Sequence, residues 1–210
     1  MGKKQTFFSA AEEELITNTI QAVEKDTAGE VAVMLVEASD SYPESRIIGG
    51  ILIGSAAALL VSDLLFSASL PVFISLSLVL SIVSSYLLGL FPAACRLFHL
   101  PAMVEERVRN RALAAFYEQG LHHTRDETGV LFFISILERK VWVLADRGIY
   151  EKISQDQLSN HAELVAAGMR KGHAADALCR EISRVGELLA RHFPPRPDDE
   201  NELTDGVIHG

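Results

Sequence analysis

Acidic side chains flank two neighbouring apolar segments in the second half of the chain. Asp126 and Glu127 precede the apolar run 129–137, and Asp146 follows the run 140–145. If the two runs pair as a β-hairpin across the short turn between them, Asp146 leaves the sheet at the end where the other two carboxylates enter it. The spacing therefore predicts three carboxylates on one rim of a small sheet.

Three carboxylates on one rim are the ligands that a hard cation such as Ca²⁺ or Mg²⁺ prefers. Asp126, Glu127 and Asp146 are accordingly the candidate metal ligands. Phosphoryl transfer at such an ion also needs a nucleophile and a positively charged clamp, for which Arg125 or Arg147 is available. The alternative is that these carboxylates are solvated loop residues or cap nearby backbone N–H groups.

Other residue types with catalytic or ligating chemistry give weaker signals. His122-His123 stands beside the acidic loop, but adjacent side chains point in different directions, so a polar loop is favoured over a metal site. The two cysteines, Cys95 and Cys179, show neither CxxC nor Cys/His spacing and are interpreted as reduced structural thiols. The sequence has no GxSxG, Walker A or glycine-rich dinucleotide motif.

The formal net charge of −9 argues against a nucleic-acid partner, because phosphate contacts require clustered Lys and Arg. Part of the acidic excess lies in a tail, 196–210, which is predicted to be flexible. The acidic residues of this tail are Asp198, Asp199, Glu200, Glu202 and Asp205.

Residues 47–95 contain a single charged residue, Asp63, and two apolar stretches at 47–66 and 71–90. Each stretch has about the 20 residues needed to cross the hydrocarbon core of a bilayer. Neither is amphipathic, as expected of helices that face lipid on most sides. The chain has too little remaining sequence to cover both helices, so the pattern predicts a transmembrane helical hairpin and makes the lipid bilayer a partner.

Positive charges flank the hairpin on its outer sides only. Lys3, Lys4, Lys25 and Arg46 precede it, and Arg96, Arg107, Arg109 and Arg111 follow it. The positive-inside rule therefore places both termini and the soluble domain in the cytoplasm, with the hairpin crossing the cell (inner) membrane twice. No signal peptide is expected at the N-terminus. Asp63, near the end of its span, is interpreted as an interfacial residue.

Gly50 and Gly54 form a GxxxG pattern in the first apolar stretch. A face of small residues allows two helices to approach closely. The partner helix is either the second stretch of the same chain or a second copy of the protein, so the sequence leaves the oligomeric state open.

The rest of the chain alternates helical and strand patterns. Ser9 and Glu12 have the spacing of a capping box, and Thr27-Ala28-Gly29 ends the helix that they open. The expected order is a helix to about residue 26, a buried strand at 30–37, the insertion, a helix from about 104 to 116, strands at 129–137 and 140–145 joined at Glu138-Arg139, and helices near 158–169 and 178–189. A small mixed sheet covered by helices buries all these apolar faces, which places the protein in the α/β class.

Several short segments carry a family resemblance. They are Thr27-Ala28-Gly29-Glu30-Val31-Ala32-Val33, Thr124-Arg125-Asp126-Glu127-Thr128-Gly129-Val130-Leu131, Glu138-Arg139-Lys140-Val141, Ala145-Asp146-Arg147-Gly148-Ile149, and His192-Phe193-Pro194 followed by Asn201-Glu202-Leu203. With these segments in this order, the chain outside the insertion resembles the TPM domain family.

The resemblance implies a three-layer α/β/α domain and, for some members of the family, acidic metal binding with a proposed phosphatase activity. Many members have an Asp-containing segment ahead of the first helix that contributes to the acidic site. This chain has Gln5-Thr6-Phe7-Phe8 there, without a carboxylate, which weakens the expectation of a complete metal or phosphatase site.

These patterns divide the chain into 1–46 and 96–195, which form the TPM-like domain, the hairpin at 47–95, and the tail at 196–210. The predicted function is a non-catalytic interaction or assembly module that acts at the cytoplasmic membrane surface with a membrane-protein partner. The alternative is a divalent-metal-dependent phosphatase that uses the rim carboxylates. In a third interpretation, the soluble domain only packs against a larger membrane partner.

Overall fold

The computed structural model describes residues 7–67, 69–196 and 206–210, and these form two compact units. One is an α/β unit made of Met1–Ser39 and Arg107–Gly210; the other is a helical unit, Asp40–Glu106. The helical unit extends beyond the predicted insertion 47–95 at both ends. Lys3, Lys4, Gln5, Thr6, the acidic tail residues and Asn201-Glu202-Leu203 lie outside the described residues.

The α/β unit opens with α1 (Ala10–Glu24) and β1 (Glu30–Val36). The predicted capping box is confirmed: the Glu12 N–H donates to Ser9 Oγ over 3.3 Å, and the Ser9 N–H donates to Glu12 Oε2 over 2.8 Å. Strand β1 is buried along its whole length, as its run of apolar residues predicts. Before β1, the Gly29 N–H donates to Thr27 Oγ1, and the Ala28 N–H donates to the carbonyl of Phe193. These bonds hold the chain in place where β1 begins.

Among the described residues, the sheet has the strand order β3-β2-β1-β4. β2 (Gly129–Ser135) runs parallel to β1, and β3 (Lys140–Ala145) runs antiparallel to β2, with Ile134 opposite Val141. The strand predicted at 129–137 is confirmed as β2, which lies between β3 and β1 and ends at Ser135. Beyond Ser135 the chain turns, with Arg139 in the left-handed region at φ 53°.

The prediction of a flexible tail over the whole of 196–210 is wrong at its end. Val207–His209 forms β4, which pairs parallel with β1, Val33 being opposite Val207. The Gly210 N–H donates to the carbonyl of Leu35 over 3.1 Å and extends the pairing. Three residues are too short for a strand signal in the sequence, and the edge of β1 supplies the hydrogen bonds that hold them.

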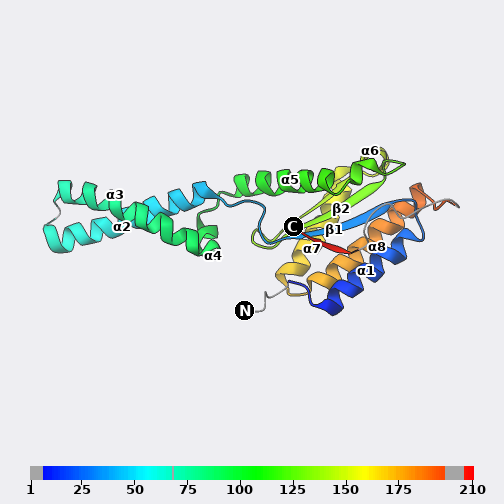
Figure 1. The fold of residues 1–210 in the computed structure, drawn as a ribbon, viewed down its shortest axis with the longest axis horizontal. Coiled ribbons are helices and arrows are strands. Elements are labelled where there is room, and N and C mark those ends of the chain that lie inside the picture. The colour runs from blue at the N-terminus through cyan, green and yellow to red at the C-terminus, as the bar shows by residue number, and fades with distance from the viewer. Residues whose placement is uncertain (1–6, 68, 197–205) are drawn as a thin grey trace. The chain divides into compact units, whose positions relative to one another are not determined.

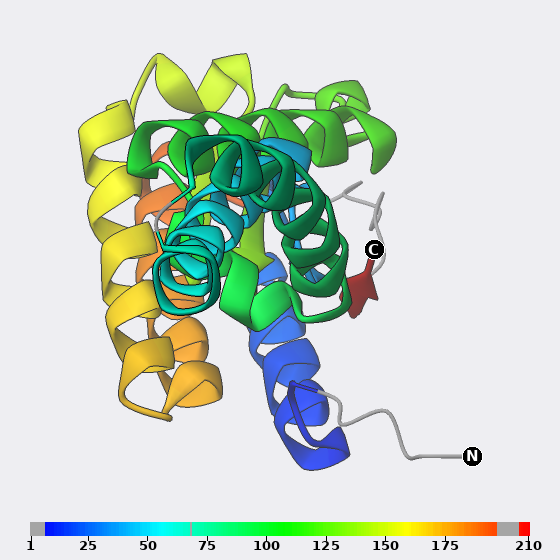
Figure 2. The same ribbon diagram turned by 90° about the vertical axis from the view of Figure 1, so that its left-hand side faces the viewer.

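One face of the sheet is covered by α1, α7 (Gln155–Arg170) and α8 (Ala174–His192), with α8 packed against both of the others (Figures 1 and 2). Alternate strand residues such as Val33 and Phe132 join these helices in one apolar core. The part of α5 (Pro101–Glu118) that belongs to this unit lies on the opposite face, where its Ala112 and Ala115 are fully buried (Figure 1). The predicted mixed α/β fold is therefore confirmed.

Within the described part of the α/β unit, two short helices were not predicted from the sequence. Leu121–His123 forms one turn of 3₁₀ helix in the expected polar loop, and α6 (Arg147–Tyr150) follows β3 directly. Gly120 and Gly172 have φ values of 73° and 78°, the left-handed conformation in which glycine commonly follows the end of a helix.

In the helical unit, α2 (Pro43–Phe66) and α3 (Leu70–Leu90) form an antiparallel hairpin, followed by α4 (Pro92–Cys95) and a 3₁₀ turn (Arg96–Phe98). The predicted hairpin is confirmed as a pair of helices. α2 begins at Pro43, four residues before the predicted stretch, because proline is compatible with the first turn of a helix.

The GxxxG face of α2 packs against α3 of the same chain. A Cβ atom on Gly50 would lie 2.7 Å from the backbone N of Ser85, and one on Gly54 would lie 2.6 Å from the carbonyl carbon of Leu80. Only glycine permits this separation of the two backbones. Of the two predicted partners for this face, the structure shows the second stretch of the same chain.

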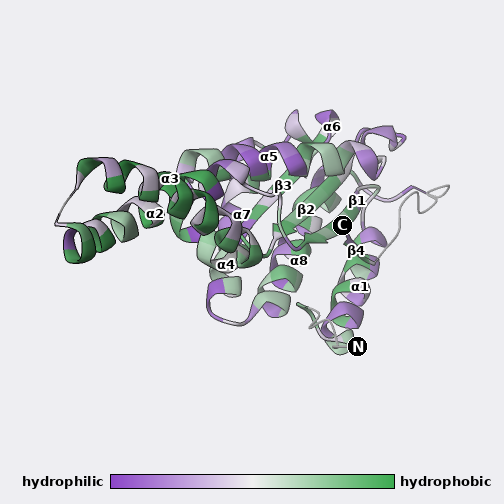
Figure 3. Ribbon diagram, turned by 60° about the vertical axis from the view of Figure 1, so that its left-hand side comes forward, coloured by the Kyte–Doolittle hydropathy of each residue, from purple (hydrophilic) through white to green (hydrophobic). Residues whose placement is uncertain are grey.

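Large apolar side chains of the hairpin point outward. In α3, 6% of the most apolar 18-residue window is buried, and in α2 the figure is 28%. Figure 3 shows both helices as largely hydrophobic along their length. Both are long and apolar enough to cross a membrane.

Candidate functional site

The predicted rim exists at the end of the sheet where β1 and β2 begin and β3 ends. The loop before β2 is tied to the start of β1, because the Glu30 N–H donates to the Thr128 carbonyl over 3.2 Å and Thr128 Oγ1 donates to the Ala28 carbonyl over 2.9 Å. Thr124 Oγ1 closes the loop on itself by accepting from the Thr128 N–H at 3.0 Å. These bonds hold the loop before β2 against the start of β1.

Asp146 lies at this rim, as the hairpin geometry predicts. Its N–H donates to the Gly129 carbonyl over 2.8 Å, and Oδ1 accepts from the Arg147 N–H at 2.7 Å as the N-cap of α6. Oδ2 is buried and has no hydrogen-bond partner within the described part of the chain. Asp146 therefore combines the capping role weighed in the sequence analysis with one unused acceptor.

Gly148 fixes the distance between α6 and the acidic loop. Its N–H donates to the carbonyl of Glu127 over 3.1 Å. A Cβ atom there would lie 2.8 Å from the carbonyl oxygens of both Asp126 and Glu127, so the backbones approach closely only because the residue is glycine.

The other two predicted ligands lie at the rim but serve different contacts. Asp126 Oδ2 forms an ion pair with Arg196 at 2.9 Å, with 28% of the Asp126 side chain exposed. Glu127 is exposed and adopts a left-handed conformation with φ 55°. Arg196 was not identified in the sequence, because it is distant in the chain and stands in a segment that was assigned to the tail.

The donor set at the rim does not fit a divalent cation in this arrangement. Among residues 7–67, 69–196 and 206–210, no three His, Cys, Asp or Glu side chains are placed to hold a metal ion. Of the three predicted ligands, Asp126 is paired with Arg196, Glu127 faces solvent, and Asp146 has a buried oxygen without a hydrogen-bond partner. The side chain of Arg147, a candidate charge clamp, is 79% exposed, and its Nε lies 3.7 Å from Oε1 of Glu151.

The histidine pair lies in the 3₁₀ turn beside the acidic loop. The rings of His122 and His123 lie 3.8 Å apart between centroids, and Tyr117 packs edge-on against His122 at 4.9 Å. Both rings therefore contact other aromatic groups.

A buried carboxylate that the sequence analysis did not single out for chemistry lies at the opposite end of the sheet. Glu138, 7% exposed, accepts from the Ser39 N–H at 3.0 Å and from the hydroxyl of Ser135. Ser39 Oγ in turn donates to Ser135 Oγ over 2.9 Å. The network connects the turn after β2 to the last residue of the α/β unit before the hairpin.

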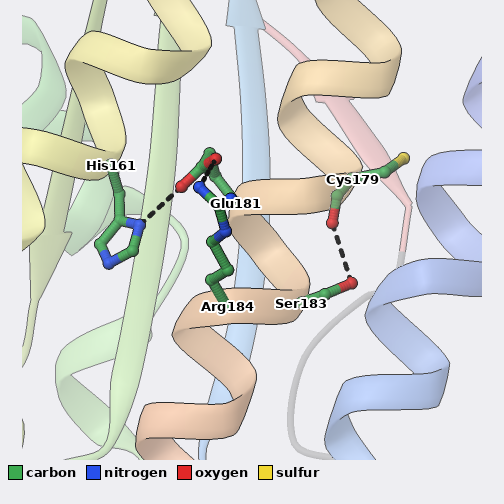
Figure 4. A network of polar contacts seen from close by, with 5 residues as sticks. All are labelled: His161, Cys179, Glu181, Ser183 and Arg184. Carbon is green, nitrogen blue, oxygen red and sulfur yellow. Dashed lines mark hydrogen bonds and ion pairs between the residues drawn. The ribbon is translucent and has the colours of Figure 1, made fainter.

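A second buried carboxylate connects two helices. Glu181 on α8, with a side chain 3% exposed, accepts from Arg184 at 2.8 Å and lies 2.8 Å from Nδ1 of His161 on α7 (Figure 4). Two partners for one buried carboxylate offset much of the cost of removing its charge from water. The sequence pattern placed this position on a helix but gave no signal for its partner, 20 residues away.

Two partly buried side chains of the α/β unit have shifted acidities. Burial raises the pKa of the Cys179 thiol and that of the Tyr150 phenol; for Tyr150 the hydrogen bond from Ala145 and the charge of Arg109 oppose the effect. Both described cysteines are free thiols, in agreement with the interpretation as structural residues.

Comparisons with known proteins give information on the fold. No family model matches the chain, and the search of curated proteins finds no match. Among solved structures, the chain is similar to the NMR structure of the BA42 protein from the psychrophilic bacterium Bizionia argentinensis, with a TM-score of 0.62 and 20% sequence identity. The match covers 100% of both chains and shows a shared fold.

Proposed function

We propose that this protein is anchored in the cell membrane by the α2–α3 hairpin and holds a TPM-like domain at the cytoplasmic surface as an interaction or assembly module. The observation that carries the proposal is the outward-facing apolar surface of the hairpin. Leu78 and Ile82 are 65% and 64% exposed, while the buried positions of α2 are serine, glycine and alanine. Water is a poor solvent for such a surface, and lipid is a good one.

The orientation follows from the charges at the two ends of the hairpin. The helix ends that carry Arg46 and Arg96 are those that continue into the soluble parts of the chain, whereas the connecting turn has no positive residue. Positive charge is enriched on the cytoplasmic side of membrane proteins. The TPM-like assignment is supported by the order of the elements and the ordered segments that resemble the family.

An interaction module at the membrane should retain its partner when membranes are dissolved gently. Affinity purification of the full-length protein from detergent-solubilised membranes, compared with a chain in which the hairpin residues Leu78 and Ile82 are both changed to Lys, tests the proposal. We expect specific co-purification of a membrane protein with the wild type and its loss with the variant. Recovery of the wild type from the cytosol, as a detergent-free monomer, would contradict the anchor.

The second candidate function is a divalent-metal-dependent phosphatase at the rim. The unused Oδ2 of Asp146 beside Asp126 favours it, although the rim side chains do not converge on an ion in the described arrangement. The test is hydrolysis of a generic phosphate ester with and without Ca²⁺ or Mg²⁺, compared with Asp126→Asn and Asp146→Asn. If the wild type and both variants are equally inactive, this candidate is rejected.

A further inference from the structure

An arginine lies in a notch at the base of the hairpin. Arg46 is in the first turns of α2, and Gly89 is near the end of α3, so both lie at the end of the hairpin that joins the rest of the chain. A Cβ atom on Gly89 would lie 2.7 Å from Nη2, 2.8 Å from Cζ and 2.8 Å from Nε of Arg46. Three nearly equal distances mean that the flat face of the guanidinium lies across the glycine.

The guanidinium of Arg46 has no protein acceptor among the residues that the structure describes. Its Nε is fully buried without a hydrogen-bond partner, and no described carboxylate forms an ion pair with it. A planar cation with five N–H donors is thus left without a counter-charge.

The position of Arg46 along the hairpin matches the boundary of a membrane. From residue 47 to Phe66 the helix has 20 residues. At about 1.5 Å per residue these span about 30 Å, the thickness of the hydrocarbon core. With the hairpin in a bilayer, the guanidinium therefore lies at the level of the lipid phosphates on the cytoplasmic side.

Exposed apolar side chains lie next to Arg46 and Gly89 in the chain. Ile47 and Ile48, directly after Arg46, are 56% and 40% exposed, and Phe91, two residues after Gly89, is 63% exposed. An arginine flanked by exposed apolar side chains matches the boundary between headgroups and acyl chains, where each type of group finds its solvent. A soluble phosphate compound would gain nothing from these apolar neighbours.

We infer that Arg46, held flat on Gly89, binds the phosphate of an anionic phospholipid in the cytoplasmic leaflet. A guanidinium matches phosphate geometry because two of its N–H groups donate in parallel to two oxygens. The inference rests on the proposed membrane anchor and adds a lipid-binding site to it. The bound lipid supplies the acceptors that the protein does not, and fixes the base of the hairpin at the membrane surface.

The test uses full-length protein reconstituted in phosphatidylcholine vesicles that contain a minor fraction of phosphatidylglycerol. Electron paramagnetic resonance of chain-labelled lipids measures how strongly the protein retains each lipid at its surface. We expect the wild type to prefer phosphatidylglycerol over phosphatidylcholine by about fivefold, the effect of one positive charge at an anionic surface. Arg46→Gln should remove most of this preference.

Gly89→Ala tests the position of the guanidinium independently of its charge. It keeps Arg46, but the added methyl group displaces the guanidinium from the notch. It should also reduce the preference. Two matched controls should retain it: Arg170→Gln removes an exposed positive charge on α7, and Ser75→Ala changes an exposed position of α3. Inorganic phosphate added at constant ionic strength should leave the preference unchanged.

The inference is overturned if inserted wild-type protein shows no preference, if Arg46→Gln and Arg170→Gln behave alike, if Gly89→Ala has no effect, or if inorganic phosphate displaces the lipid. Carbonate washing tells the two claims apart. If the protein remains in the vesicles after the wash, these results reject the lipid site and leave the membrane anchor in place. If the wild type does not insert, both the anchor and the lipid site are rejected.

Discussion

The α/β unit buries its large apolar side chains, whereas the α2–α3 hairpin exposes them and buries small residues. In the α/β unit, Phe132 and Ile134 are fully buried, and α7 and α8 turn polar residues outward. In the hairpin, Leu78 and Ile82 are mostly exposed, and Gly50 and other small residues of α2 lie inside. This difference supports the proposal that the hairpin faces lipid while the α/β unit faces water.

The comparison also explains how polar groups are used in each unit. The α/β unit buries carboxylates such as Glu138 and Glu181 and provides each with hydrogen-bond donors. The hairpin buries small residues, which allow the helix backbones to approach, and has one cation, Arg46, without a described acceptor. If the hairpin lies in lipid, as proposed, close packing replaces the hydrophobic effect as the force that joins its two helices.

The largest expected effect comes from replacing phenylalanine by alanine at one buried position of the α/β unit and at one exposed position of the helical unit. Phe132→Ala removes a fully buried ring and should lower the free energy of unfolding of the α/β unit by about 3–5 kcal/mol. Urea unfolding of the full-length protein in detergent, followed by fluorescence of Trp142, the single tryptophan, measures it. Phe91→Ala, at a position 63% exposed, should change this value by less than about 0.5 kcal/mol. Equal losses would contradict the contrast.

Placing a charge on the outer face of the α2–α3 hairpin tests directly whether this face meets lipid. Leu78→Arg, near the centre of α3, should cost about 2.5–3.5 kcal/mol of insertion if this face meets lipid. The measurement is the fraction of newly translated protein that resists carbonate extraction. Leu164→Arg, on the outer face of α7 and 48% exposed, should leave that fraction unchanged. A fully inserted Leu78→Arg protein would break the comparison.

The buried carboxylate network of the α/β unit gives a smaller effect. Glu138→Ala leaves the Ser39 N–H and the Ser135 hydroxyl without their acceptor, which should lower the free energy of unfolding by about 1–3 kcal/mol. Trp142 fluorescence during urea unfolding measures the loss. Glu163→Ala, at an exposed position of α7, is the matched control and should have little effect. Similar results for both would mean that the network adds no stability.

The smallest effect concerns the capping box of α1. Ser9→Ala should cost about 1 kcal/mol at neutral pH. Hydrogen bonds from the Ser9 backbone and side chain hold the pKa of Glu12 below its usual value of 4.5. The stabilisation is therefore present above that value and is lost as the pH falls through the lowered pKa. The wild-type advantage, from urea unfolding at several pH values, should shrink in acid; a constant advantage would contradict this.

Much of the fold could be predicted from the sequence because its signals are local. The capping box at Ser9, the glycine helix ends and the apolar runs of β1 and β2 each depend on residues that are neighbours in the chain. The hairpin was also found locally, from the length and evenness of its apolar stretches. Strand β4 was missed because three residues form a strand only when the edge of β1 is already in place.

The candidate site was predicted in position but not in detail. The register of the β2–β3 pair places Asp146 beside the loop that carries Asp126, and the structure confirms that rim. The partners of these carboxylates come from elsewhere: Arg196 follows α8, 70 residues beyond Asp126 in the chain. Such pairs depend on how the helices pack on the sheet, which local patterns do not encode. The notch that holds Arg46 depends in the same way on the packing of α2 against α3.

The central claim is that the outward apolar surface of the hairpin is solvated by lipid, and high-speed sedimentation of cell extracts tests it most directly. We expect full-length protein to stay in the membrane pellet through washes with high salt and alkaline carbonate, and to enter solution only with detergent. A full-length product that remains in the supernatant without detergent, as a monomer, would contradict it.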